Sequence, residues 1–213
     1  MFISFEGIEG CGKTTQVHRL ARRLEALGIP VRTTREPGGT AIGEEIRSVL
    51  LDARNQHLSP LAELFLYAAD RSQHVQDVIR PALAEGKWVL CDRYVDATTV
   101  YQGYSRGLDM HLVRVLNETA TGGLLPDITF LLDCPVEVGL GRALHRNREM
   151  ALEGQDRFEL EQKQFHESVR EGYLKLSDSE KERFILIDAT RAEEEMETVI
   201  FKHIRPLLGH QKK

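Results

Sequence analysis

The chain of 213 residues lacks the marks of several protein classes. Its three cysteines, Cys11, Cys91 and Cys134, show no metal-type spacing, and its eight histidines form no metal-binding pattern. No apolar run is long enough to cross a membrane, and a net charge of −5 gives no sign of binding to a nucleic acid polymer. Met1 leads directly into an apolar run without a charged segment, so we expect no signal peptide and a cytoplasmic location. The cysteines are then expected to be buried or passive thiols in a reducing compartment.

Internal repeats, low-complexity tracts and interdomain linkers are also missing from the sequence. A chain of this length suffices for one sizeable core, so we expect a single domain spanning 1–213. Short apolar runs alternate with segments of helical character, and they lie at 2–5, 31–34, 88–91, 128–132 and 184–187. This alternation predicts an α/β fold, with a five-stranded parallel sheet flanked by helices.

Three helices can be predicted with their boundaries. The first spans 16–27 and ends before Gly28, the second is a long helical region from Ser59-Pro60 to about residue 85, and the third begins at Pro135. Proline suits a first helical position because its missing N–H has no partner there. From 142 to 158 the apolar pattern gives way to charged and polar residues, which indicates a mobile loop or a lid.

A glycine-rich loop follows the first predicted strand. Residues 7–14, GIEGCGKT, match the pattern G-x-x-x-x-G-K-[ST] between a strand and a helix. Backbone N–H groups of such a loop approach phosphate oxygens, and the helix N-terminus favours negative charge. Lys13 is expected to reach the β- and γ-phosphates, and the Thr14 hydroxyl is expected to bind Mg²⁺. The residues expected to hold ATP here are Gly7, Ile8, Glu9, Gly10, Cys11, Gly12, Lys13, Thr14 and Thr15.

The phosphate loop alone does not identify a reaction, because GTPases, ATPases and kinases share it. A GTPase needs a guanine-binding N-K-x-D element, and the sequence contains none. A regulatory ATPase uses a residue that positions water, whereas a kinase needs a second site for its acceptor. The segments after the second and third strands therefore decide between these classes.

Two charged motifs follow those strands, REPGGT at 35–40 and Asp92-Arg93-Tyr94. Ligands of open parallel sheets bind outside the carboxyl ends of the strands, so both motifs are expected beside the phosphate loop. Asp92 suits a carboxylate that holds Mg²⁺ directly or through water, and Arg93 suits a clamp for a second phosphate. Arg47, on the following helix, could share that clamp. The alternatives are an ion pair that ends a strand and a solvent-facing helical arginine.

These segments resemble bacterial thymidylate kinases, which are P-loop nucleoside monophosphate kinases. The matching elements are FEGIEGCGKTT, TREPGGT, LYAADR with DRYVDATTVYQG, and a basic segment that ends in DRFE. They span most of the chain in the family's order, and REPGG is the most diagnostic of them. The resemblance implies phosphoryl transfer from ATP to dTMP, giving dTDP and ADP, with Mg²⁺ and in a homodimer.

The resemblance also implies roles for the acceptor site. Glu9 corresponds to the acidic residue that meets the sugar 3′-hydroxyl, and Tyr101 to the ring that crowds the 2′ position. Tyr67 corresponds to the aromatic that stacks on the base, and Arg71 to the donor to a thymine carbonyl. Thr98 and Gln102 correspond to positions at the polar edge of the base. The other substrate-binding residues expected are Glu36 of REPGG, Arg47 and Arg93.

Other interpretations of these acceptor residues are open. Glu9 could face solvent on the outer side of the loop, and Tyr67 and Tyr101 could be core aromatics. Arg71 could form an ion pair on a helix surface with Asp70. If the assignment holds, we expect strong rejection of dCMP and partial rejection of dUMP, because the thymine methyl contributes only about 1–3 kcal/mol.

A phosphate acceptor is already ionised, so the reaction needs cations and alignment more than a general base. The phosphate loop carries no arginine, whereas the segment 142–158 carries Arg142, Arg146 and Arg148. The expected catalytic residues are Lys13, Arg93, Arg146 and, in reserve, Arg148. Arg142 is expected to pack against adenine. The alternative is a solvated charged loop.

Two other functions compete with a dTMP kinase. A deoxynucleoside kinase phosphorylates a neutral 5′-hydroxyl, which requires a carboxylate base and no phosphate clamp. A P-loop regulatory ATPase hydrolyses ATP without an acceptor. Arg47 and Arg93, as a phosphate clamp, argue against a deoxynucleoside kinase. A regulatory ATPase would release ADP without an acceptor, whereas a dTMP kinase would need one.

Overall fold

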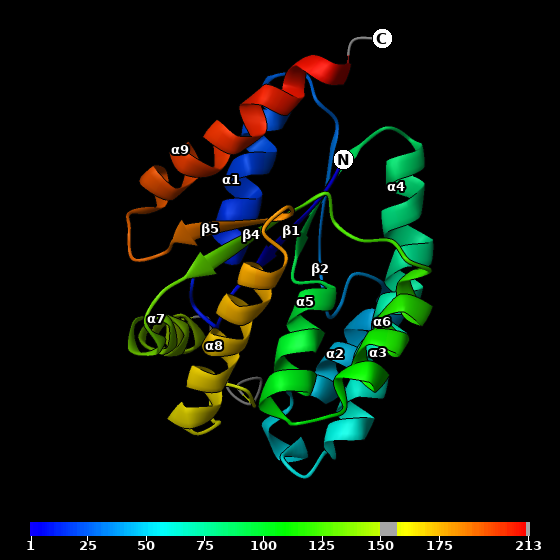
Figure 1. Cartoon of the computed structure of the whole chain (residues 1–213), viewed down its shortest axis with the longest axis vertical. Helices are drawn as coiled ribbons and strands as arrows, with labels where there is room; N and C mark the ends of the chain where they lie inside the picture. The colour runs from blue at the N-terminus through cyan, green and yellow to red at the C-terminus, as the bar shows by residue number, and fades with distance from the viewer. Residues whose placement is uncertain (150–156, 212–213) are drawn as a thin grey trace.

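The computed structural model of the chain describes residues 1–149 and 157–211, and the side chains of 1–147 and 157–208. Five parallel strands form one sheet in the order β2-β3-β1-β4-β5 (Figure 1). Their bounds are β1 Phe2–Glu6, β2 Val31–Arg35, β3 Trp88–Asp92, β4 Ile128–Asp133 and β5 Phe184–Asp188. The predicted five-stranded parallel sheet flanked by helices is confirmed. After β1 the chain crosses to β2 at one edge of the sheet and then returns to β3, which pairs with β1. The strands β4 and β5 lie on the other side of β1, so β1 is the central strand.

Helices cover both faces of the sheet. On one face α1 (Lys13–Ala26) packs along α9 (Glu193–Ile204), and the apolar side of α1 buries Val17, Leu20 and Leu24. On the other face lie α5 (Val95–Thr98), α6 (Met110–Thr121) and α8 (Lys163–Ser179), with α3 (Pro60–His74) beside α6 and α2 (Ala41–Leu51) beside α3 (Figure 1). Every helix therefore has an apolar side against the sheet or a neighbouring helix.

The region from 59 to about 85 is helical as predicted, but it consists of three successive elements. The α-helix α3 ends at His74, a π-helical stretch covers Val75–Ile79, and α4 covers Arg80–Ala84. Pro81 lies in the first turn of α4, and proline has no N–H to continue an α-helical hydrogen-bond ladder. A wider π-helical turn ahead of it keeps the chain helical while the ladder is broken.

The segment from 142 onward differs from its prediction. The helix α7 spans Val136–Glu149, so residues 142–149 form a helix and the expectation of a loop is wrong for them. Arginine, alanine, leucine and glutamate are strong helix formers, and a polar helix needs only a narrow apolar side, here including the buried Ala143. Residues 150–156 lie outside the described part of the chain.

The remaining elements are short helical turns at Ala53–Asn55, Thr99–Ser105 and Arg205–Gln211. No helix within the described residues combines the length and the apolar character needed to cross a membrane. The three cysteines are buried free thiols, and burial raises the pKa of each. This agrees with the expectation of passive thiols.

Candidate functional site

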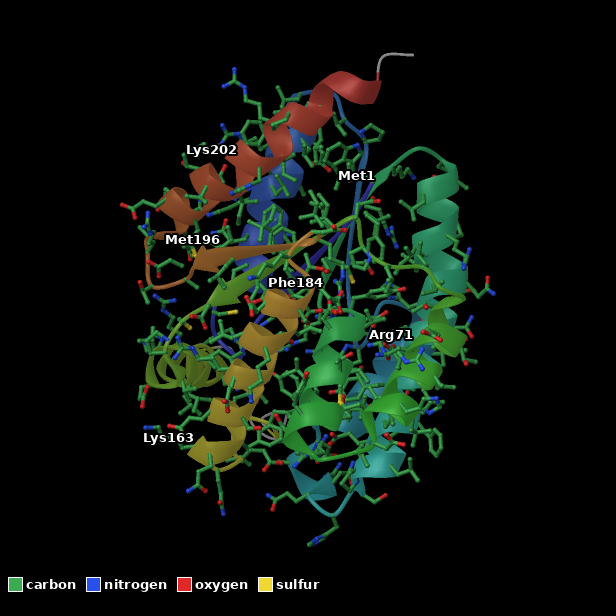
Figure 2. All side chains as sticks on the ribbon, viewed as in Figure 1. Met1, Arg71, Lys163, Phe184, Met196 and Lys202 are labelled. Atoms are coloured by element: carbon green, nitrogen blue, oxygen red, sulfur yellow. The ribbon has the colours of Figure 1, made fainter. Side chains whose placement is uncertain are left out.

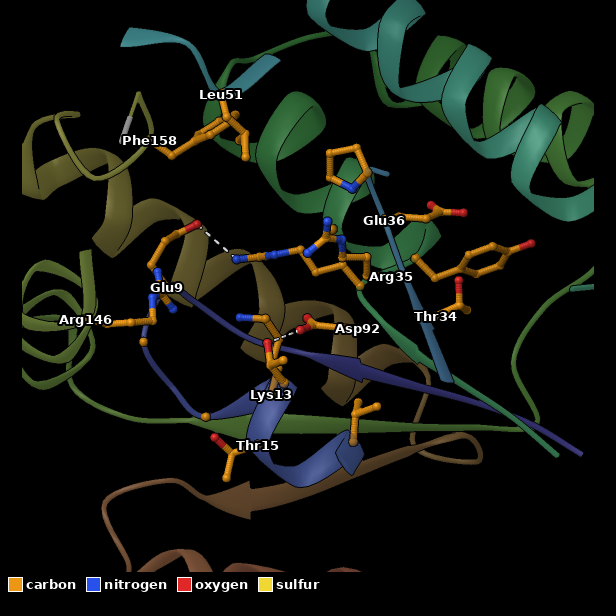
Figure 3. A pocket seen from close by; sticks show the side chains of 18 of the residues that line it. Glu9, Lys13, Thr15, Thr34, Arg35, Glu36, Leu51, Asp92, Arg146 and Phe158 are labelled. Atoms are coloured by element: carbon orange, nitrogen blue, oxygen red, sulfur yellow. Dashed lines mark hydrogen bonds and ion pairs between the residues drawn. The ribbon is translucent and has the colours of Figure 1, made fainter. Parts of the chain in front are cut away.

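A cleft of about 1010 Å³ opens at the carboxyl ends of the strands. Its lining comes from the phosphate loop, the segment after β2, the helix α3, the segment after β3, the helix α7 and the loop before α9. The side chains in Figure 3 converge on this space from elements far apart in sequence, with Glu9 and Lys13 from the loop and Arg146 from α7. The sheet thus brings the predicted motifs to one edge.

Backbone conformation explains the glycines of the phosphate loop. Gly7, Gly10 and Gly12 have positive φ values of 136°, 68° and 98°, a region that residues with a Cβ rarely adopt. A Cβ on Gly10 would lie 2.0 Å from the carbonyl oxygen of Gly139 in α7. The loop can therefore pass against α7 only with glycine at position 10.

The loop also positions a lysine and a hydroxyl. Lys13 is 7% exposed, and its Nζ donates to the carbonyl oxygens of Gly7 at 3.1 Å and Ile8 at 2.7 Å. The Thr14 hydroxyl donates to Asp92 at the end of β3. A hydroxyl and a carboxylate side by side are oxygen ligands of the kind that Mg²⁺ prefers. The predicted pair for the metal is therefore brought together.

Glu9 points into the molecule, so the solvent-facing alternative is wrong. Its Oε1 accepts from Arg93 Nη2 at 3.0 Å and from the Tyr101 hydroxyl at 2.6 Å, and its Oε2 lies 3.4 Å from His166 Nδ1. Burial raises the pKa of the Glu9 carboxyl, but His166, Arg93 and Lys13 outweigh burial and hold this pKa well below its usual range. Glu9 is therefore a buried carboxylate that stays ionised.

Arg93 is held in a strained conformation beside Glu9. Its φ of 69° is the only positive value among the non-glycine residues of the described chain, and such a conformation costs about 1–3 kcal/mol. Its Nη1 donates to the Tyr173 hydroxyl at 3.2 Å, and its guanidinium lies 4.9 Å from the ring centroid of Tyr101. The turn after β3 thereby aims this arginine into the cleft.

Arg71 is buried at 1% exposure rather than on a helix surface (Figure 2). Its Nε donates to Glu36 and its Nη1 to the Asn117 amide oxygen, while its Nη2 donates to the Tyr94 carbonyl and the Thr98 hydroxyl. A guanidinium has five N–H donors, so one remains after these four bonds to described residues. Arg71 lines the cleft and can offer that donor to a ligand.

Glu36 supports Arg71 from behind. Its Oε2 accepts from Arg71 Nε at 2.8 Å, and its Oε1 lies 2.9 Å from His74 Nδ1. The other ring nitrogen of His74 lies 2.6 Å from the Thr34 hydroxyl. Both oxygens of the Glu36 carboxylate are thus occupied by protein groups, so Glu36 holds Arg71 in place, and its contact with the substrate stays a prediction.

A further buried carboxylate lies behind the cleft on α3. Glu63 is 0% exposed, and it accepts from Gln102 Nε2 at 2.7 Å and from Arg157 Nη2 at 2.6 Å. Gln102 lines the cleft, and so does Tyr67, which lies one helical turn after Glu63 on α3. The predicted base-binding residues therefore share one wall, and Arg157, which follows the segment 150–156, is anchored to it.

The predicted arginines outside the strands also reach the cleft. Arg47 lines it and donates from Nη1 to the Pro37 carbonyl at 2.9 Å, and burial lowers the Arg47 pKa. Arg142 lines the cleft as well and donates to the Ala189 carbonyl at 2.8 Å. Arg47 is therefore not a freely solvated helical arginine.

Arg146 lines the cleft from α7 with its side chain 46% exposed. It donates to the Asn147 amide oxygen at 3.1 Å and lies 3.5 Å from Glu159. The side chain of Arg148 lies outside the described residues. Arg146 is thus a lining cation with a weakly held side chain.

Sequence reasoning missed His166, Tyr173, His74, Asn117 and Glu63. Tyr173 and His166 are seven residues apart on α8, which places them on one helix face, and this spacing was the only signal available for them. The others make contacts between separate segments that no local motif records. Groups of histidine, cysteine and acidic residues able to hold a metal are absent from the described residues.

Comparisons with known proteins agree on one family. Residues 5–200 match the family model described as Thymidylate kinase. A thymidylate kinase of Geotalea uraniireducens is 55% identical over 199 residues, 93% of each chain, and one of Desulfosudis oleivorans is 60% identical over 190 residues, 89% of each chain. The crystal structure of thymidylate kinase from Ehrlichia chaffeensis superposes with a TM-score of 0.76 at 33% identity, covering 96% of this chain and 98% of the other.

Proposed function

We propose residue roles for this chain, which belongs to the thymidylate kinase family. The reaction is the transfer of a phosphoryl group from ATP to dTMP, giving dTDP and ADP. The observation that carries these roles is the cleft itself. It joins a phosphate loop at one end to a wall of residues predicted to bind the base at the other, with cations between them.

The donor binds at the phosphate loop in this proposal. Backbone N–H groups of residues 7–15 surround the phosphates, with the N-terminus of α1 behind them. Lys13 exchanges its bonds to the Gly7 and Ile8 carbonyls for bonds to the β- and γ-phosphates. Arg142 packs against adenine at the far end of the cleft.

Thr14 and Asp92 are proposed to hold Mg²⁺. The metal neutralises charge on the β- and γ-phosphate oxygens when it is bound. The hydroxyl and the carboxylate already lie in contact, so these two side chains would hold the ion with oxygen ligands of the kind that it prefers.

The acceptor dTMP binds on the other side of the central cations. Its phosphate lies against Arg93 and Arg47, and its 3′-hydroxyl donates to the carboxylate of Glu9, whose Oε2 lies 3.4 Å from His166 Nδ1 and accepts no hydrogen bond among the described residues. Tyr67 stacks on the base and Tyr101 crowds the 2′ position. Arg71, held by Glu36, donates to a thymine carbonyl, and Thr98 and Gln102 meet the polar edge.

Transfer needs no general base because the attacking oxygen belongs to an ionised phosphate. Charge builds on the transferring phosphoryl group, and positioned cations stabilise it. Lys13 and Arg93 hold fixed positions beside it, and Arg146 reaches it from α7, with Arg148 as the alternative. The chain acts as one kinase domain whose lid comprises 142–158.

We also propose a homodimer in the cytoplasm. Large apolar side chains are exposed on the neighbouring helices α2, α3 and α6, namely Ile42, Val49, Leu61, Phe65 and Val115. Exposed apolar patches of this kind commonly mark protein interfaces. Light scattering during gel filtration tests the dimer, and a monomeric mass at micromolar concentration would contradict it.

The test of the function is ADP release from Mg²⁺–ATP with no acceptor, thymidine, dTMP, dUMP or dCMP. We expect turnover with dTMP well above dUMP and little with dCMP or without acceptor. Turnover with thymidine but not dTMP would identify a deoxynucleoside kinase. ADP release that ignores the acceptor would identify a regulatory ATPase.

A further inference from the structure

We propose that Glu63 determines which bases this kinase accepts by fixing the orientation of the Gln102 side-chain amide. The inference rests on the dTMP kinase activity proposed above. Glu63 itself lines no part of the cleft, so it acts as a positioning residue through Gln102.

Each oxygen of the Glu63 carboxylate accepts a hydrogen bond from a buried side chain. Oε2 accepts from Arg157 Nη2 at 2.6 Å, and Oε1 accepts from Gln102 Nε2 at 2.7 Å. Nε and Nη2 of Arg106 lie 3.4 Å from the two oxygens. Glu63 and Gln102 are both almost completely buried, at 0% and 1% exposure, so no bulk water competes for these bonds.

The Glu63 carboxylate, which the Arg157 guanidinium holds at 2.6 Å, only accepts hydrogen bonds. A glutamine amide has a donor end and an acceptor end of nearly the same shape, and rotation by 180° exchanges them. If Gln102 turned its oxygen toward Glu63, two acceptors would face each other at hydrogen-bond distance in a buried site. Glu63 therefore holds the Gln102 nitrogen toward itself and leaves Gln102 Oε1 as the group available to the cleft.

The consequence for the base follows from its hydrogen-bonding edge. Thymine has a donor at N3 and an acceptor at O4, whereas cytosine has an acceptor at N3 and an amine donor at C4. Arg71 can only donate, and it keeps one free N–H. An acceptor from Gln102 beside a donor from Arg71 matches thymine at both positions and mismatches cytosine at both.

Of these two groups, only the amide could adapt to cytosine. A guanidinium has no acceptor to offer, but a freely rotating glutamine could donate to cytosine N3 and recover one bond. Glu63 removes that freedom. Uracil presents the same edge as thymine, so Glu63 contributes nothing to the discrimination between dTMP and dUMP.

The test compares Glu63→Gln with the wild-type enzyme. In the variant, we expect Arg157 to donate to the amide oxygen of residue 63. The amide nitrogen of residue 63 then faces Gln102. Gln102 then presents its oxygen to that nitrogen and its own nitrogen to the cleft. We expect the kcat/KM ratio of dTMP over dCMP to fall by about tenfold or more, while the ratio of dTMP over dUMP stays at the wild-type value.

A double variant and a control make the test specific. Glu63→Gln with Gln102→Glu restores an acceptor to the cleft with unchanged total charge, and it should restore the preference for dTMP over dCMP. Arg106→Met removes a cation that touches the same carboxylate without touching Gln102, and it should leave both ratios unchanged.

A folded Glu63→Gln variant with wild-type ratios, or with both ratios reduced equally, overturns the proposal. If circular dichroism finds this variant unfolded, Gln102→Leu decides the question. The leucine variant should lose preference for dTMP over dCMP, and full retention of that preference overturns the proposal. Failure of the kinase function itself is distinguishable, because the wild-type enzyme would then release no ADP in response to dTMP.

Discussion

The central strand carries a buried acid whose titration should be visible in the stability of the fold. Glu6, the last residue of β1, is 0% exposed. Its Oε1 accepts from the Tyr94 backbone N–H and its Oε2 from the Tyr173 hydroxyl, both at 2.7 Å. Burial, followed by the nearby Asp96 carboxylate, raises the pKa of Glu6 from 4.5 to about 8, although Arg93 opposes the shift. Glu6 is therefore mainly protonated in the folded enzyme at neutral pH.

The sign of the effect follows from proton linkage. The unfolded chain releases the Glu6 proton near pH 4.5 and the folded enzyme near pH 8, so the contribution of Glu6 is complete below 4.5 and is lost as the pH rises toward 8. Each unit of pH within that window lowers the free energy of unfolding by about 1.4 kcal/mol. Between pH 5.5 and 7.5 the loss amounts to roughly 2–3 kcal/mol.

The variant Glu6→Gln isolates this contribution. Glutamine has one donor and one acceptor end, as the protonated acid does, but it does not titrate. We expect the unfolding free energy of the variant, measured in urea relative to the wild type, to rise by about 2–3 kcal/mol from pH 5.5 to 7.5. Asp70, whose pKa is raised to about 6, chiefly by burial, titrates in both proteins and cancels. Glu118→Gln on the exposed side of α6 serves as the control, and a difference between Glu6→Gln and wild type that is independent of pH would refute the argument.

Three further outcomes test the cleft. Arg146→Ala should lower kcat by at least about 100-fold while KM for dTMP hardly changes, and normal turnover would move the role to Arg148. Asp92→Asn should raise the Mg²⁺ concentration for half-maximal ADP release by about tenfold or more, and an unchanged requirement would exclude this carboxylate from the metal site. Gly10→Ala should lower the unfolding free energy by at least about 1–2 kcal/mol, because φ is 68° and its Cβ would meet the Gly139 carbonyl; an unchanged urea midpoint would contradict this.

The fold was predictable because alternation of apolar runs and helical periodicity is a local signal. Each strand nevertheless extends one residue beyond its apolar run, and that residue is always charged, at Glu6, Arg35, Asp92, Asp133 and Asp188. The apolar residues end where the sheet meets the cleft, whereas the strand pairing continues for one more residue, as between Phe5 and Asp92. The charged residue that ends each strand therefore belongs both to the sheet and to its carboxyl edge.

The candidate site was predictable to the extent that it lies in continuous motifs. The phosphate loop is one, since its glycine spacing reflects the positive φ values at positions 7, 10 and 12. The partners that hold the predicted residues were not predictable. His74, Asn117 and Glu63 come from helices that meet the motifs only after folding, and each is an ordinary polar residue of an amphipathic helix until its neighbours are known.

Arg71 illustrates what those partners add. An arginine in a base-binding pocket could hydrogen-bond in several directions, and the sequence alone assigns it only a donor role. Its surroundings occupy four of its five N–H groups, so a single donor is left for the ligand. Selectivity against a wrong base depends on buried groups that lack a partner when that base binds. We therefore expect Glu36 and Asn117, which occupy two of the other donors of Arg71, to contribute to selectivity without touching the nucleotide, as proposed for Glu63 through Gln102.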